Sequence, residues 1–224
     1  MSRTFRSFKY IFLQAQVIFA LVAGLGLFLL LVFEGFLNFE NGFQIKEIVN
    51  AAAFNILLLG ILFVGLTLAS YYQLLCPFYL AFSTTRKGIY LSMKVIAWLP
   101  VLELFLLSLI LLTFADSNSK ATVISSYAGI TGIALIALSF GEFMGVLSLK
   151  FAKFGRIFPA ILGGIGGGIG GFCSSFFADV ESVRTLTIAV ILERYAHIFL
   201  ITGIALYLIT NIAVYRIIRK LSVH

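Results

Sequence analysis

The sequence predicts an all-α, polytopic membrane protein with six transmembrane helices. Hydrophobic residues make up 61% of the 224 residues, charged residues make up only 11%, and the mean hydropathy is +1.10. This exceeds what a water-soluble domain can bury. The apolar residues also form stretches of about 20 or more, the length a helix needs to cross roughly 30 Å of hydrocarbon. We place the spans at residues 11–33, 50–75, 95–115, 123–148, 157–178 and 195–215.

The connections between these spans are short, so we expect one transmembrane domain over 1–224 and no soluble domain. Most of the 16 basic residues fall in four clusters, which lie before span one, between spans two and three, between spans four and five, and after span six. They are Arg3, Arg6 and Lys9; Arg86, Lys87 and Lys94; Lys150, Lys153 and Arg156; and Arg216, Arg219 and Lys220. Short loops rich in Lys and Arg stay in the cytoplasm. The pattern therefore predicts that both termini are cytoplasmic.

The net charge of +7 is explained by this topology and by contact with anionic membrane lipids. We therefore expect membrane lipids as partners and no nucleic acid.

Signatures of catalysis and of cofactor binding are missing from the chain. It has no Gly-rich phosphate loop ending in Lys-Ser or Lys-Thr, no His-Glu-x-x-His and no Gly-x-Ser-x-Gly. The two histidines, His197 and His224, are too few for a metal site. Cys76 and Cys173 are expected at opposite membrane faces, where they cannot pair. We expect no catalytic residue, no metal and no cofactor bound by this chain.

Two carboxylates, Glu103 and Glu142, lie inside predicted spans three and four. Counted from Lys94 and Lys150, each lies roughly 12–14 Å from the cytoplasmic edge at 1.5 Å per residue. A carboxylate in hydrocarbon is expensive and is a functional candidate by default. Either the two line an inward-facing transport pathway, or each is hydrogen-bonded and holds neighbouring helices together.

Predicted span five carries the densest small-residue pattern: Gly163, Gly164, Gly166, Gly167, Gly168, Gly170 and Gly171. Several pairs are four residues apart, which lets two helix backbones approach closely in lipid. Gly163, Gly164, Gly167, Gly168 and Gly171 are therefore candidates for tight helix packing. The alternative is a helix that bends or slides as a gate, because glycine also lowers the cost of bending.

Two segments carry a resemblance to a known family. Glu142 and Gly145 precede Lys150-Phe151-Ala152-Lys153-Phe154-Gly155-Arg156, and Pro77-Phe78-Tyr79-Leu80-Ala81-Phe82-Ser83-Thr84-Thr85-Arg86-Lys87 precedes span three. These resemble the fourth helix with its following turn, and the stretch before helix three, of small bacterial ABC-2-type transporter permeases. The resemblance covers the six-span layout.

The resemblance implies a permease subunit in the bacterial plasma membrane that pairs with a second copy, as a homodimer, and with two ABC ATPase subunits that bind ATP and Mg²⁺. It implies an amphipathic connecting helix over 1–10, a cytoplasmic coupling segment over 76–94 and an outer re-entrant segment over 179–194. The ATPase-coupling residues would be Phe78, Phe82, Ser83, Thr84, Thr85, Arg86 and Lys87.

The expected function is ATP-driven export of a hydrophobic or amphipathic substrate such as a peptide, an antimicrobial or a lipid-like compound. The chain itself would not be an enzyme. The main alternative is a secondary transporter in which Glu103 or Glu142 carries a coupling proton or ion. No internal repeat that such transporters often contain is visible in the sequence. A membrane scaffold or an unfamiliar membrane enzyme is the third class considered.

Overall fold

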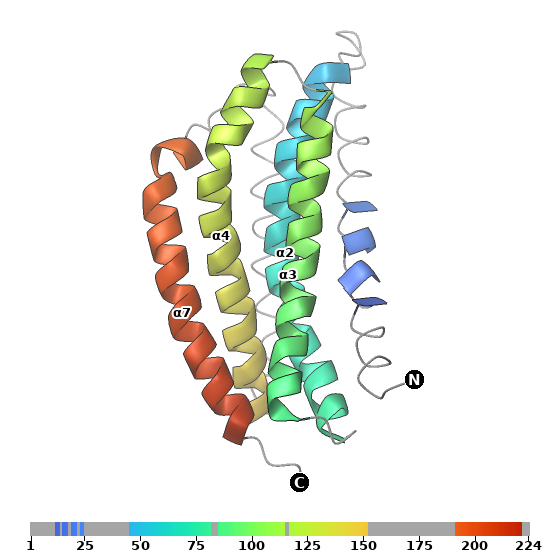
Figure 1. Ribbon diagram of the computed structural model, residues 1–224, viewed down its shortest axis with the longest axis vertical. Coiled ribbons are helices and arrows are strands. Elements are labelled where there is room, and N and C mark those ends of the chain that lie inside the picture. The colour runs from blue at the N-terminus through green and yellow to red at the C-terminus, as the bar shows by residue number, and fades with distance from the viewer. Residues whose placement is uncertain are drawn as a thin grey trace.

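The structure is a computed structural model that describes most residues of 12–24 and residues 45–81, 85–114, 117–151 and 191–220. Its long helices are α2 (Ile45–Ala81), α3 (Arg86–Leu112), α4 (Ser117–Lys150) and α7 (Ala196–Lys220), and the described residues contain no strand (Figure 1). The described residues of 12–24 are also helical. The prediction of an all-helical chain is confirmed for the part that the structure describes.

Each long helix contains a segment long and apolar enough to cross a membrane: Ile56–Pro77, Arg86–Leu112, Val123–Lys150 and Ala196–Lys220. Four of the predicted spans, at 50–75, 95–115, 123–148 and 195–215, are thereby confirmed as candidate membrane helices. The predicted span at 11–33 is described only in part. The span at 157–178, with its glycine run, lies outside the described residues, as does the connecting helix over 1–10.

The beginning of α3 differs from the prediction. The sequence placed Lys94 in a loop before the third span, but α3 begins at Arg86 and Lys94 lies inside the helix. The reason is the capping residue Thr85, which has extended backbone angles of −65° and 142° and whose hydroxyl accepts a hydrogen bond from the Gly88 amide at 3.2 Å. Such a cap satisfies an amide at the helix start.

Helix α2 extends beyond the predicted span of residues 50–75 and continues through Pro77 to Ala81. Transmembrane helices tolerate an internal proline where neighbouring groups compensate for the missing hydrogen bond. Residues 76–81 of the predicted coupling segment are therefore helical, residues 86–94 belong to α3, and the connection between the two helices is short.

Helix α4 occupies the middle of the bundle, with α2 packed on one side and α7 on the other, while α3 packs mainly against α2 (Figure 1). Small residues allow the close approach of α4 and α2. A Cβ atom built on Gly141 would lie 2.0 Å from the carbonyl oxygen of Gly65, and one on Gly145 would lie 2.7 Å from the Cβ of Tyr72. These short distances mean that a side chain at either glycine would collide with α2. Glycine therefore permits the close helix packing that is common in membranes.

The contact between α4 and α7 has the same character. A Cβ atom on Gly132 would lie 2.4 Å from the carbonyl carbon of Phe199, and one on Gly203 would lie 2.6 Å from the carbonyl oxygen of Gly132. Close helix packing by glycine therefore occurs in α2, α4 and α7. The prediction of tight packing by the glycine run of residues 163–171 concerns residues that the structure does not describe.

Candidate functional site

Two rows of polar and aromatic residues face each other across α3 and α7, and we call them together the polar ladder. The rows are Arg86, Tyr90, Lys94 and Trp98 on α3, and Tyr207, Asn211, Tyr215 and Arg219 on α7. Members of each row are four residues apart, so each row follows one face of its helix. The helices are antiparallel, because the beginning of the α3 row meets the end of the α7 row.

The centre of the site is an ion pair between Lys94 of α3 and Glu142 of α4. The Lys94 ammonium group donates to both carboxylate oxygens, at 2.6 Å for Oε1. The Glu142 side chain has no exposed surface and that of Lys94 is 14% exposed. Removing two charges from water is costly, and close contact with full hydrogen bonding is what offsets the cost. Glu142 thus balances a charge that the sequence analysis had assigned to a loop.

Aromatic rings surround the ammonium group of Lys94. Its Nζ atom lies 4.6 Å from the ring centroid of Tyr207, 5.4 Å from that of Tyr90, and 3.4 Å from the Tyr207 hydroxyl. The face of an aromatic ring attracts a cation at these distances. Trp98 fixes Tyr207 in turn, because its indole nitrogen donates to the Tyr207 hydroxyl at 2.6 Å and the two rings meet edge to face at 5.6 Å.

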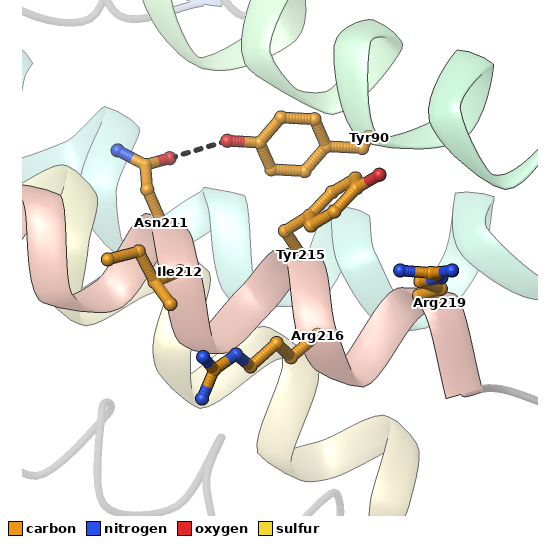
Figure 2. A pocket seen from close by; sticks show the side chains of 6 residues that line it. All are labelled: Tyr90, Asn211, Ile212, Tyr215, Arg216 and Arg219. Atoms are coloured by element: carbon orange, nitrogen blue, oxygen red, sulfur yellow. Dashed lines mark hydrogen bonds between the residues drawn. The ribbon is translucent and has the colours of Figure 1, made fainter.

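The ladder continues toward the end of α7 where basic residues gather. The Tyr90 hydroxyl donates to Oδ1 of Asn211 at 2.9 Å, and the Tyr90 and Tyr215 rings meet edge to face at 5.3 Å (Figure 2). Beyond them, Nη1 of Arg86 donates to the backbone carbonyl of Arg219 at 2.7 Å. The first residue of α3 is thereby fastened to the last turn of α7.

The predicted coupling residues fall in and around this corner. Thr85 caps α3, Arg86 binds the Arg219 carbonyl, and the side chain of Lys87 is exposed. Phe82, Ser83 and Thr84, and the side chain of Phe78, lie outside the described residues.

Glu103 has a different partner from Glu142. Its Oε1 atom accepts a hydrogen bond from the side-chain amide of Gln16, whereas its Oε2 atom is buried without a partner among the described residues. The described contacts therefore do not join Glu103 to Glu142. Of the two predicted pathway carboxylates, Glu142 binds Lys94 of the polar ladder, and Glu103 makes a separate contact with Gln16 of the first helical segment.

The sequence analysis did not identify Tyr90, Trp98, Tyr207 or Asn211 as site residues. The signal was present, since polar or aromatic residues recur every fourth position in both rows. Such a stripe in an otherwise apolar helix marks a face that does not lie against hydrocarbon.

Within the described ranges, no three His, Cys, Asp or Glu side chains come together as a metal site would require. What the arrangement can do is hold opposite charges within membrane helices and present hydrogen-bond donors at the basic end of α7. Comparison with known protein families, with curated proteins and with solved structures finds no match to this chain.

Proposed function

We propose that the chain is the permease subunit of an ABC-type exporter, with six spans, both termini in the cytoplasm and no ATP site of its own. Two copies would form a homodimer in the bacterial plasma membrane and would bind two ATPase subunits, which hold ATP and Mg²⁺. The cargo would be hydrophobic or amphipathic: a peptide, an antimicrobial or a lipid-like compound. The observation that supports this proposal most directly is the hydrogen bond between Arg86 and the Arg219 carbonyl.

A permease that does not hydrolyse ATP needs a cytoplasmic element whose movement reaches the membrane helices. The short connection between α2 and α3 fits this requirement, because Thr85 caps α3 and Arg86 fastens it to α7. A force applied to this connection would act on α3 and α7 together. The exposed side chain of Lys87 offers a charge for the rim of an ATPase contact, where charged residues normally lie.

The test begins with tagged protein purified in mild detergent from its native membrane, with mass spectrometry of the proteins that remain bound. We expect an ABC ATPase subunit in equal amount and ATP hydrolysis by the purified complex. Purification of the wild-type chain without any ATPase subunit would overturn the proposal.

Two variants assign roles at the corner. Lys87→Glu should reduce the amount of bound ATPase, because it reverses an exposed charge at the proposed contact. Arg86→Gln should retain the ATPase but reduce hydrolysis that depends on transport. The matched control is Arg219→Gln, which removes a positive charge from the same corner while leaving the backbone carbonyl that Arg86 binds.

The ion pair of Lys94 and Glu142 favours one second candidate, a transporter coupled to protons or other ions. A carboxylate within the membrane whose partner can be exchanged is how such transporters carry a coupling ion. This candidate predicts substrate flux in liposomes that hold only this chain, driven by a proton gradient and abolished by Glu142→Gln. The absence of gradient-driven flux in such liposomes would remove it, and the exporter proposal would be unaffected.

A further inference from the structure

A pocket of about 370 Å³ opens between α3 and α7 beside the end of the polar ladder. Its lining comprises Tyr90, Asn211, Ile212, Tyr215, Arg216 and Arg219, and Figure 2 shows Arg216 extending toward Ile212, with Arg219 at the opposite side of Tyr215. The pocket is open to the surroundings over much of its extent, so it is a surface groove and not an enclosed cavity. Neither the exporter proposal nor its alternative assigns a role to this pocket.

The charge of the pocket is positive and uncompensated among the described residues. Arg216 and Arg219 are exposed, the lining contains no carboxylate, and neither arginine forms an ion pair with a described residue. The guanidinium group of Arg86 lies next to Arg219, whose carbonyl it binds. The start of α3 and the end of α7 meet here with opposite partial charges that cancel. The preference for an anion therefore comes from the side chains.

The hydrogen-bonding groups of the pocket are mainly donors. Oδ1 of Asn211 is taken by the Tyr90 hydroxyl, which leaves the amide nitrogen of Asn211 to donate, and Figure 2 shows this nitrogen directed away from Tyr90. Each guanidinium group adds several further donors in a planar fork that matches an oxyanion. The chemistry suits a phosphate or similar group.

An apolar row leads away from the arginines along the same face of α7. Ile204, Leu208 and Ile212 precede Arg216 at intervals of four residues, and their exposed fractions are 44%, 58% and 56%. The row from residue 204 to residue 216 extends about 18 Å at 1.5 Å per residue. That is close to half of a bilayer, about 15 Å of hydrocarbon and the headgroup next to it. A free phosphate would use only the arginines, whereas a phospholipid would use the whole row.

We propose that this pocket binds the phosphate of an anionic phospholipid, with an acyl chain lying along Ile204, Leu208 and Ile212. Basic pockets between membrane helices at the membrane–water boundary recognise lipid headgroups in this way. The pocket lies at the end where α3 begins and where α4 and α7 end, at Arg86, Lys150 and Lys220 (Figure 1). The positive charge of this end fits the anionic leaflet that faces the cytoplasm. The inference does not depend on what the protein transports.

The experiment measures binding of phosphatidylglycerol, and separately of phosphatidylcholine, to the full-length protein in detergent by native mass spectrometry. We expect clear preference for phosphatidylglycerol. Arg216→Gln and Arg219→Gln should each weaken it about fivefold, which corresponds to about 1 kcal/mol for one basic residue near a membrane surface. The double variant should weaken it about 25-fold. Circular dichroism should show unchanged helix content in all variants.

The control is Lys150→Gln, which removes an exposed positive charge from the same end of the bundle but not from the pocket. It should change the preference less than twofold, and an effect equal to that of the arginine variants would overturn the proposal by showing general surface attraction. Equal binding of both lipids by the wild type would also overturn it. Inorganic phosphate forms the last arm: full displacement of phosphatidylglycerol at equal concentration would assign the pocket to free phosphate.

Discussion

Separating the two charges of the Lys94–Glu142 pair should destabilise the bundle more than removing both. Lys94→Met would leave the Glu142 carboxylate, which has no exposed surface, without a cation. Breaking a buried pair from one side typically costs 3–5 kcal/mol. We expect about 4–5 kcal/mol for this variant, because the remaining charge is fully enclosed.

Glu142→Gln should cost less, about 3 kcal/mol. The remaining Lys94 ammonium keeps the faces of Tyr90 and Tyr207 at 5.4 and 4.6 Å, and such contacts are worth about 0.5–2 kcal/mol. The Lys94 side chain is also partly exposed and can extend toward water. The double variant removes both charges but leaves an uncharged amide buried at position 142, so we expect it to cost about 1–2 kcal/mol, less than either single variant.

The assay is the free energy of unfolding from titration with sodium dodecyl sulfate in mixed micelles, followed by circular dichroism as a full double-mutant cycle. Lys150→Met serves as control, since this exposed lysine at the end of α4 should change stability by less than about 0.5 kcal/mol. Additive losses, with the double variant less stable than either single variant, would refute the reasoning. Single losses below about 1 kcal/mol would refute it equally.

Three further predictions concern other contacts. Gly141→Ala should destabilise the protein by about 1–3 kcal/mol in the same titration, because its Cβ would meet the α2 backbone at 2.0 Å, whereas Gly24→Ala, with nothing within 4 Å, should be neutral or stabilising. Tyr207→Phe removes the hydroxyl that accepts from Trp98, so the fluorescence of this single tryptophan should shift to shorter wavelength; an unchanged spectrum would contradict the hydrogen bond. Glu103→Gln should change stability by less than about 1 kcal/mol, because its partner is an uncharged amide; a loss above 3 kcal/mol would point to an ion pair.

The sequence was sufficient to predict four of the apolar helices and to single out Glu142, which the structure places in a buried ion pair. In lipid, the backbone groups of an apolar run must form their hydrogen bonds within the run, and a helix does this. A run of about 20 apolar residues therefore locates a membrane helix from the sequence alone. The sequence was not sufficient to predict the partner of Glu142. A lysine next to other basic residues normally marks a loop, and only a carboxylate 48 residues further along the chain makes Lys94 acceptable inside α3.

The glycine contacts are a second feature that the sequence alone was not sufficient to predict. Spacing of small residues by four is a packing signal, and in the sequence it is densest in the glycine run of residues 163–171, which lies outside the described residues. Gly141 and Gly145 have this spacing too, and they contact Gly65 and Tyr72 because α4 lies next to α2. Which small residues face each other depends on which helices are neighbours in the bundle. The spacing of residues within one helix does not predict this.

The position of Lys94 bears on how the chain enters the membrane. Synthesis delivers α3 before α4, because Glu142 follows Lys94 by 48 residues along the chain. Lys94 is eight residues from the start of α3, about 12 Å along the helix. A lysine side chain that extends toward water can reach the membrane–water boundary from this depth. We expect α3 to insert with its ammonium group held at the surface, and the arrival of α4 to draw that group inward. The ion pair between Lys94 and Glu142 would then form only after both helices have been inserted correctly.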